Sequence, residues 1–376
     1  MKGVTKENIK KYALNEFLTE YKELNTDNKY RPVAVGRYGI RKRESIYSKE
    51  LAKDYSKNKL IHKGTLTVGM GSKQIDIGIL IEDETFAVSP AYHTYEIQGI
   101  RCKYLEYCLQ SKNIEMFSLY AKRGSRQGKS VDLKRWLTYK IPVYSEKDQI
   151  VIEENLNKIN YVIELRRKQI DLLDELVKAR FVEMFGDPVI NDKKWLTVSV
   201  ENLCDEIYGG GTPSKAHKEY YENGDIPWVS SKDMKTDVLT DSQIKINQLG
   251  IENSTARLVP VNSVIMVIRS GILKHTLPVA INAVPITVNQ DLKVFIPGNK
   301  ITPRFLAMQF KMHEKSILFG VRAVTADNIE FNSLKARKMI VPPLELQNQF
   351  ASFLEEIDKS RLLSNHSLFL IKSITF

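Results

Sequence analysis

The chain has 376 residues, of which 43% are hydrophobic and 27% charged, as in an ordinary globular protein. At roughly 100–200 residues per domain, this length predicts two or three domains, each able to bury its own core. Lys and Arg number 56 against 45 Asp and Glu, so the net charge is +11. That excess favours a polyanionic partner, such as nucleic acid or an anionic membrane surface.

The sequence argues against membrane insertion and secretion. Apolar runs such as Val264–Ile268 fall far short of the roughly 20 residues that span a bilayer, and the N-terminal residues contain no apolar signal core. The three cysteines, Cys102, Cys108 and Cys204, form no C-x-x-C pair and no disulfide framework. We therefore expect a cytoplasmic protein that has no membrane partner.

The first half of the chain predicts a mixed domain followed by one long helix. Helices are expected over Lys6–Glu23 and, with amphipathic spacing, over Lys103–Phe117. Glu146–Phe185 is rich in Glu, Lys, Leu and Ile and contains neither Gly nor Pro, which predicts a helix about 60 Å long. Asp187-Pro188 ends that helix.

The second half predicts the same plan. Ser263–Ile268 and Ala283–Val288 are apolar and β-branched, as expected of strands, and Gly, Pro and Asn punctuate the loops between them. Pro303–Ser316 predicts a helix, and Glu345–Phe376 predicts a second long helix.

Several segments recur at an offset of about 200 residues, which is the signature of an internal repeat. Their common order indicates a duplicated unit, in which a mixed domain precedes a long helix. The matched segments are Gly64-Thr65-Leu66 with Asn262-Ser263-Val264, Phe86-Ala87-Val88 with Ile286-Thr287-Val288, Tyr104-Leu105 with Phe305-Leu306, Ile141-Pro142-Val143 with Val341-Pro342-Pro343, and Gln149 with Gln349.

The predicted fold class is therefore α+β, with two domains of mixed α/β structure in tandem and a pseudo-two-fold internal repeat. Two long antiparallel helices, paired as a coiled coil, separate the domains. The predicted boundaries are residues 1–145 for the first domain, 146–187 for the first spacer helix, 188–343 for the second domain and 344–376 for the second spacer helix.

Apolar residues at alternating spacings of four and three predict the seam of the helix pair. An ordinary amphipathic core helix is the alternative interpretation. Polar Arg361 and Ser364 interrupt the second seam, and apolar positions outside the stripe, such as Leu172 and Leu176, leave surface for a further partner. The predicted seam residues are Ile152, Leu156, Ile159, Ile163, Ile170, Leu173, Val177, Leu354, Ile357, Leu368 and Ile371.

The candidate catalytic motifs lack the residue spacing that their sites require. Gly124–Ser130 has three residues between its glycines where a phosphate loop needs four, and no apolar strand precedes it, so an NTPase is disfavoured. Gly209-Gly210-Gly211 lacks the spacing of a dinucleotide site. The six histidines show no metal-ligand spacing, and the chain contains no methylase or nuclease motif. We predict no catalytic residue, no metal and no cofactor in this chain.

Clusters of basic and polar residues in loops predict contacts with nucleic acid, since Arg and Lys can read guanine edges and Gln can read adenine. A solvated basic surface is the alternative interpretation. In the first domain the candidates are Arg37, Arg41, Lys42, Arg43, Arg123, Arg126, Gln127 and Lys129. In the second they are Thr212, Ser214, Lys215, Ser230, Ser231, Lys232, Arg269, Ser270 and Arg322.

The second half carries the motifs of a known family. Gly210–Lys215 (GGTPSK) and Gly224–Ser230 (GDIPWVS), with Asn289–Lys293 (NQDLK) and Val341–Gln347 (VPPLELQ), resemble a target-recognition domain of the specificity (S) subunit of type I restriction–modification systems. Ala179–Pro188 resembles the frame of the family's central conserved helix. The first half lacks the GGTPS opening and so resembles another recognition subtype.

The resemblance implies a non-catalytic subunit that binds double-stranded DNA. Each target-recognition domain would read one half of a bipartite sequence, and the conserved spacer helices would set the gap. The same helices would dock methyltransferase (modification) subunits, two in number, which carry S-adenosylmethionine. A motor-nuclease (restriction) subunit would add cleavage.

Two alternatives remain open at this point. The chain could be the recognition subunit of a related system in which one fused polypeptide methylates and cuts DNA. It could also be a coiled-coil scaffold that binds no nucleic acid.

Overall fold

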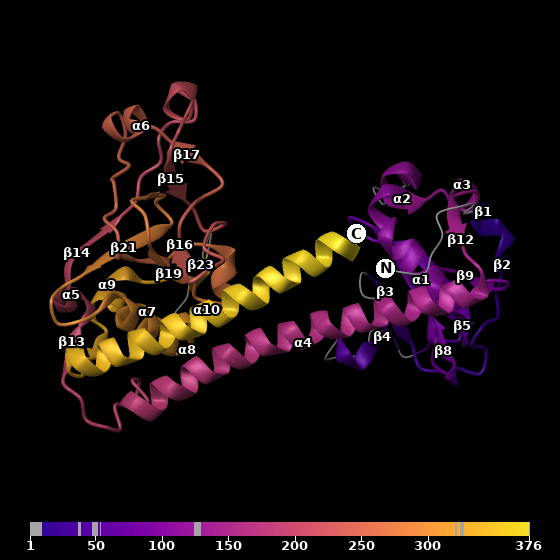
Figure 1. Cartoon of the computed structure of the whole chain (residues 1–376), viewed down its shortest axis with the longest axis horizontal. Coiled ribbons are helices and arrows are strands. Elements are labelled where there is room, and N and C mark those ends of the chain that lie inside the picture. Colours follow the sequence, from indigo (N-terminus) through magenta and orange to yellow (C-terminus); the bar gives the residue numbers. More distant parts are fainter. Residues whose placement is uncertain are drawn as a thin grey trace. The chain divides into compact units, whose positions relative to one another are not determined.

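The computed structural model describes residues 10–36, 39–46, 52, 54–123, 129–319, 322–323 and 327–375. The chain divides into two compact units, of which unit 1 comprises Met1–Leu165 with Leu368–Phe376 and unit 2 comprises Arg166–Ser367. Each unit combines a β-sheet with short helices and with part of a long helix (Figure 1). The predicted α+β class is confirmed.

Unit 1 is built around the antiparallel sheet β2–β9–β6–β7, formed by Leu18–Glu20, His93–Ile97, Thr65–Met70 and Ile75–Ile79. The side chains of its inner face pack against α1 (Cys102–Ser111) and α2 (Asn113–Tyr120), so that Leu66, Leu105 and Trp136 are fully buried. The paired strands outside this sheet are β1 (Lys10–Ala13) with β12 (Lys140–Val143), β3 (Val33–Gly36) with β4 (Gly39–Lys42), β5 (Lys59–Ile61) with β8 (Phe86–Val88), and β10 (Ala121–Arg123) with β11 (Lys129–Val131). The short helices are η1 (Leu14–Glu16), η2 (Arg43–Ser45) and α3 (Leu133–Trp136).

Unit 2 repeats this plan around the sheet β14–β21–β18–β19–β16, formed by Cys204–Gly209, Leu292–Pro297, Val264–Val267, Val279–Asn282 and Val238–Leu239. A second sheet consists of β17 (Lys245–Ile246), β15 (Ile226–Val229) and β20 (Thr287–Val288), and the pairs β13 (Thr197–Ser199) with β24 (Lys338–Ile340) and β22 (Arg322–Ala323) with β23 (Asp327–Asn328) lie outside it. The helices are α5 (Val200–Leu203), η3 (Lys218–Tyr220), α6 (Gln248–Glu252), η4 (Gly271–Lys274), α7 (Pro303–Met312), α8 (Glu314–Leu318) and α9 (Phe331–Ala336).

The internal repeat is confirmed strand by strand. The order β2–β9–β6–β7 in unit 1 corresponds to β14–β21–β18–β19 in unit 2. Leu66 lies opposite Ile79 and Tyr95, just as Val264 lies opposite Ile281 and Phe295. The turn before each central strand contains a residue at positive φ, Gly64 (87°) in one unit and Asn262 (66°) in the other. Asn tolerates this conformation better than most residues, because its short side chain can hydrogen-bond locally.

One pairing from the repeat is wrong. Gln149 corresponds to Gln347 and not to Gln349, because both glutamines are buried near the start of a long helix and bind the same kind of backbone groups. Gln149 accepts from the Arg101 amide (3.1 Å) before α1, and Gln347 accepts from the Thr302 amide (2.8 Å) before α7. Gln349 is exposed.

The long helices form as predicted. Helix α4 spans Glu146–Phe185 and α10 spans Leu344–Thr375. Ser145 caps the start of α4 by accepting from the Asp148 amide (3.2 Å), and Gly186 at φ 75° ends it.

Two other predicted elements are wrong. The expected helix over Lys6–Glu23 is, in its described part, β1, η1 and β2. The three- and four-residue spacing of Leu14, Phe17 and Leu18 comes from one 3-10 turn between strands, and pairing with the distant β12 and β9 overrides the helical pattern. The expected strand over Ala283–Val288 is a loop as far as Ile286, since Asn282 Nδ2 donates to the carbonyl of Val284 (2.9 Å) and turns the chain. The helices expected over Lys103–Phe117 and Pro303–Ser316 each form but break, at Lys112 and His313.

Candidate nucleic-acid interface

In unit 2 several loops meet at the edge where β15 and β20 end and β21 begins. We call this the recognition-loop cluster, comprising residues 211–214, 229–232, 268–270 and 289–291. Backbone hydrogen bonds join its segments: Gly211 N donates to Val288 O (3.0 Å), Asn289 N to Val229 O (2.9 Å) and Ile268 N to Asp291 O (2.9 Å). The buried sheets therefore hold four loop segments, each with one exposed residue, in a fixed arrangement.

The two glycines of the GGTPS segment serve close packing. A Cβ atom on Gly210 would lie 2.0 Å from the Val288 carbonyl oxygen, and one on Gly211 would lie 2.2 Å from the Thr255 backbone. The buried Trp228 indole donates to Gly211 O (2.9 Å), and the Thr212 hydroxyl donates to Gln290 Oε1. This explains why a Gly-rich stretch without dinucleotide spacing occurs here.

Arg269 is held by an acidic residue of the same cluster. Its Nε donates to Asp291 Oδ1 (2.7 Å), and its side chain remains 48% exposed. Asn289 Nδ2 in turn donates to Asp291 Oδ2 (3.2 Å). Neighbouring Ser270 caps η4 through the Ile272 amide (3.4 Å). Arg269 is thus orientated by Asp291 and presents its exposed part at the loop edge.

The loop after β15 is a tight turn. Ser230 donates from its hydroxyl to Asp233 Oδ2 (2.7 Å), and the Lys232 amide donates to Ser230 Oγ (3.4 Å). Ser231 is half-buried and the Lys232 side chain is exposed. Ser214 and Lys215 are exposed as well, but Lys215 lines a separate hollow of 420 Å³ with Lys218 and Tyr221.

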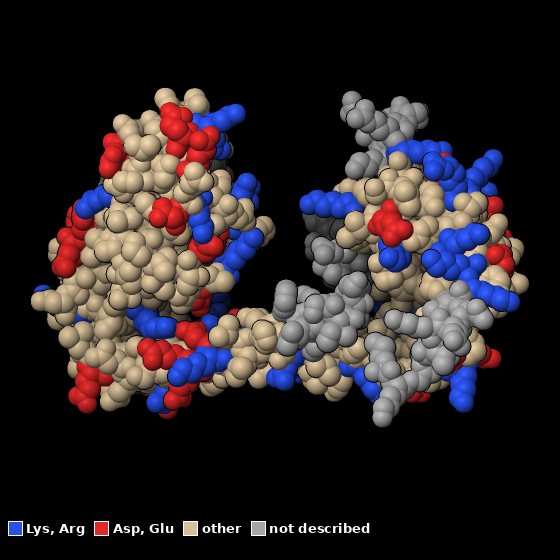
Figure 2. Space-filling view, turned by 45° about the horizontal axis from the view of Figure 1, so that its top comes forward, with Lys and Arg blue, Asp and Glu red and all other residues tan. Residues whose placement is uncertain are grey.

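In unit 1 one basic candidate, Arg43 of η2, lies near strand β11. Arg43 lines a hollow of 520 Å³ together with His93 and Ser130. Lys42 pairs with Glu84 (3.5 Å), and Arg41 is exposed. The structure therefore brings Arg43 to the same hollow as Ser130 of β11. On the face shown in Figure 2, Lys and Arg dominate unit 1, whereas unit 2 shows both signs of charge.

Some candidates cannot be placed. Arg37, Arg126 and Gln127 lie outside the described residues. Arg123, Lys129 and Arg322 belong to β10, β11 and β22, and their side chains are outside the described part.

The described seam side chains are all at least half-buried. In unit 2 the contacts between α4 and α10 run antiparallel, since Phe185 meets Phe350 (5.7 Å between ring centroids) and Asp174 meets Arg361. A continuous coiled coil stays a prediction, and the Ile371 side chain lies outside the described part. The buried seam residues are Ile163, Val177 and Ile357, and the half-buried ones are Ile152, Leu156, Ile159, Ile170, Leu173, Leu354 and Leu368.

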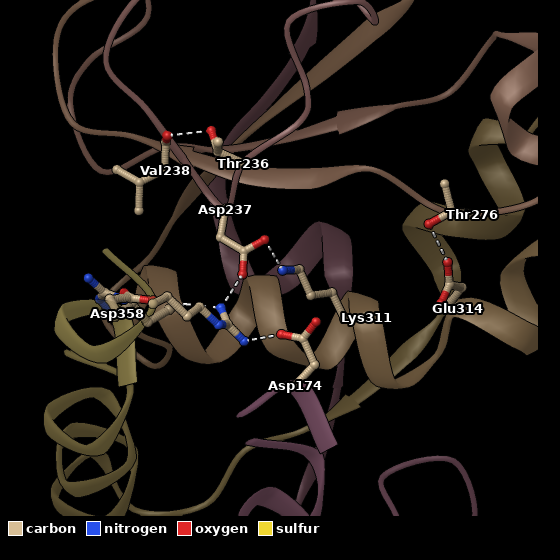
Figure 3. Close-up of polar contacts among 10 residues, drawn as sticks. Asp174, Thr236, Asp237, Val238, Thr276, Lys311, Glu314 and Asp358 are labelled. Carbon is tan, nitrogen blue, oxygen red and sulfur yellow. Dashed lines mark hydrogen bonds and ion pairs between the residues drawn. The ribbon is translucent and has the colours of Figure 1, made fainter. Parts of the chain in front are cut away.

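Residues that sequence reasoning missed form a charged network beside these helices. Asp237, in the loop before β16, pairs with Lys311 of α7 (2.5 Å) and with Arg361 of α10 (3.2 Å). In Figure 3 the carboxylates of Asp174 and Asp237 point toward one guanidinium. Both carboxylates accept hydrogen bonds from Arg361. The polar residue Arg361 in the second seam was the one feature of the sequence that pointed to this network.

The described residues form neither a membrane-spanning helix nor a metal site. None of their helices is long and apolar enough to cross a membrane. Within the same residues, no group of three or more His, Cys, Asp or Glu side chains is placed to hold a metal ion.

Comparison with known proteins gives a family. Residues 192–371 match the type I restriction modification DNA specificity domain. The chain is 35% identical over 153 residues to the EcoR124I/EcoR124II specificity subunit of Escherichia coli, covering 40% of this chain and 38% of that subunit. It is 28% identical over 193 residues to the MjaIX specificity subunit of Methanocaldococcus jannaschii, covering 49% and 43%. The matches thus span less than half of these relatives.

Solved structures share the fold over nearly the whole chain. The S subunit of a type I restriction–modification system from M. genitalium superposes with a TM-score of 0.56 at 13% identity, covering 100% of this chain and 96% of that one. A second structure, from work on complex assembly of the type I system, gives 0.56 at 15% identity, covering 97% and 95%. At these identities the likeness concerns the fold alone.

A stretch similar to a DNA specificity domain therefore lies in the second half of a chain that consists of two units. Its second half is thus similar in sequence, and its whole chain is similar in fold, to type I restriction–modification specificity subunits.

Proposed function

We propose that this chain is the non-catalytic DNA-specificity subunit of a type I restriction–modification complex and binds a bipartite target in the cytoplasm. The supporting observation is the recognition-loop cluster, which lies inside the segment that matches the DNA specificity domain. Residues 1–145 and 188–343 would each bind one half-site, while 146–187 and 344–376 would separate them.

Each unit has its own set of proposed contacts. In unit 2, exposed Lys232 and Ser214 suit phosphate contacts, and Arg269, orientated by Asp291, suits a guanine edge. In unit 1, Arg41, Lys42 and Arg43 would bind the other half-site. Because the two units share a fold but differ in their loop residues, each half-site would have a different sequence.

The long helices would dock the modification subunits. Leu172 and Leu176 lie on α4 outside the seam and are 52% and 48% exposed. Exposed leucines on a helix whose other face is buried suit an apolar partner helix. The modification subunits, two by analogy with the repeat, would supply S-adenosylmethionine, and a restriction subunit would supply cleavage.

Mapping methylated bases in DNA from cells that carry the intact system tests this proposal. We expect one bipartite motif with an unspecified gap, which disappears when this chain is deleted. A contiguous motif, or methylation that persists without the chain, would contradict it.

A further inference from the structure

Residues 188–343, which carry the recognition-loop cluster and which we call the recognition body of unit 2, pack against the long helices at two places of different chemistry. Four aromatic rings form the first, with Phe305 of α7 stacked against Phe181 (5.4 Å) and in edge contact with Phe185 (4.8 Å) of α4. Phe350 of α10 completes the group against Phe181 (5.4 Å). All four rings are fully buried. Apolar contact of this kind holds the parts together but specifies direction weakly.

The second fastening is the charged network. Arg361 of α10 binds Asp174 of α4 and Asp237 of the recognition body, and it lies 3.7 Å from Asp358 of its own helix. Lys311, at the far end of α7 from Phe305, holds the other oxygen of Asp237 (2.5 Å). The Arg361 side chain is only 19% exposed. One guanidinium therefore ties three segments together with directional bonds.

Apolar packing alone does not hold the recognition body in position at the charged network. A hollow of 430 Å³ lies between the loop before β16, α7 and the long helices, and its lining includes Met234, Ile281, Met308 and Leu354. Asp237 and Arg361 stand at the same hollow. The apolar surfaces are not in close contact around this hollow. The ion pairs therefore oppose a rotation of the recognition body about the group of four phenylalanine rings.

The charges of Lys311 and Arg361 stabilise the ionised form of Asp237. Burial opposes ionisation of Asp237, but attraction by Lys311 and Arg361 prevails and holds the pKa of that carboxyl below its usual value. The carboxylate is therefore charged at neutral pH and the network is intact.

Unit 1 uses different chemistry at the matching turn of its helix. There the Tyr107 hydroxyl donates to Asn157 Oδ1 (2.6 Å) and accepts from Asn160 Nδ2 (3.1 Å). The offset that equates Gln149 with Gln347 places Ile163 at the position of Arg361. The ion pairs at this turn are thus a feature of unit 2, whereas in unit 1 Arg101 pairs with Glu153 of α4 at an earlier turn (2.8 Å).

We propose that Arg361 is a positioning residue that fixes the rotation of the second recognition domain on the helix pair and thereby sets the gap between the two half-sites. This inference rests on the proposed function. Helix α4 is continuous from Glu146 to Phe185, so a rotation of the recognition body about its last turns would change the phase at which that body meets DNA.

The test uses the chain assembled with its modification subunits. Duplexes carry the mapped half-sites at the native gap and at gaps one or two base pairs shorter or longer, and methylation is read by sequencing. For Arg361→Ala we expect preference for the native gap to fall roughly tenfold, or about 1.4 kcal/mol, with the half-site sequences unchanged. Arg361→Lys keeps the positive charge and should retain part of the preference for the native gap.

Matched variants separate positioning from general damage. Asp237→Asn should reproduce the Arg361→Ala result, and the double variant should add little, because both remove the same contact. Arg257→Ala removes the pair with Glu206 (2.8 Å), which lies within the recognition body, and should leave gap preference intact. If Arg361→Ala does not assemble with the modification subunits, the gap preference of the Asp237→Asn complex decides the test.

The outcomes are distinct. Broadened gap tolerance with native half-sites supports the proposal. Unchanged gap preference overturns it, and so does equal loss of methylation at every gap by a variant that assembles. A wild-type complex that shows no bipartite preference would instead refute the proposed function.

Discussion

In each unit a buried glutamine near the start of the long helix binds backbone groups of the preceding domain. Gln347 is fully buried and satisfies three backbone groups: its Oε1 accepts from Thr302 N (2.8 Å), and its Nε2 donates to Lys300 O (3.1 Å) and Pro342 O (2.9 Å). We expect Gln347→Ala to lower the free energy of unfolding by about 2–4 kcal/mol, because these groups lose their partners in a dry site. Denaturant unfolding measures the change. Exposed Gln349→Ala is the matched control, and equal effects of the two variants would contradict the assignment.

His313 makes unit 2 sensitive to acid. It is 3% exposed at the break between α7 and α8, and burial, aided by the nearby Arg337 guanidinium, lowers its pKa from 6.5 to about 4. The unfolded chain takes up the proton first as pH falls. The stability that neutral His313 contributes is therefore complete above pH 6.5 and is lost as pH falls through 4, by up to roughly 3 kcal/mol.

Thermal unfolding between pH 7.5 and 4 tests this prediction. His313→Gln removes the titrating group, so its Tm should fall less over that range than the wild-type Tm. His275→Gln, at an exposed histidine of the same unit, should follow the wild-type profile. Parallel profiles for all three proteins would show that other groups cause the acid sensitivity.

The candidate site was predictable as far as residue type and loop position allow. Arg269, Ser230 and Thr212 do meet in one cluster, because the ends of neighbouring strands lie at the same edge of a sheet. Their acceptors, Asp291, Asp233 and Gln290, were missed as site residues. The pairs of Thr212 with Gln290 and of Arg269 with Asp291 join distant positions in the chain, which local spacing does not encode. Ser230 and Asp233 are close in sequence, but they belong to a tight turn that shows no periodic pattern.

At the scale of elements, the long helices were predictable and the first strands were not. Helix α4 repeats one apolar spacing over 40 residues, so chance patterns average out. Strand β1 has four residues and β2 has three. Their pairing with β12 and β9 depends on contacts more than 70 residues away, which local periodicity cannot report.

Helix α4 offers a test of its two faces. Val177 is 6% exposed in the core with Ile357, whereas adjacent Leu176 is 48% exposed. We expect Val177→Asp to cost about 3–5 kcal/mol and to prevent folding of unit 2, because its charge would be buried without a partner. Leu176→Asp should fold normally and lose binding to the modification subunits.

Circular dichroism and co-purification with the modification subunits measure these effects. Normal binding by Leu176→Asp would place the docking surface elsewhere, and a folded Val177→Asp would refute the assigned core face.

At the scale of the whole molecule, the net charge of +11 is shared by two bodies of one fold. Each loop-lined surface would release counterions on binding, by about 0.9 per phosphate contacted. If both units bind DNA, the logarithm of affinity should fall more steeply with the logarithm of salt for a duplex with both half-sites than for one with either half scrambled. Binding of the assembled complex, followed by fluorescence anisotropy over a salt series, measures the slopes. A slope that does not change when one half-site is scrambled would mean that the unit reading that half makes no specific phosphate contacts, since the methyltransferase contribution is the same for every duplex.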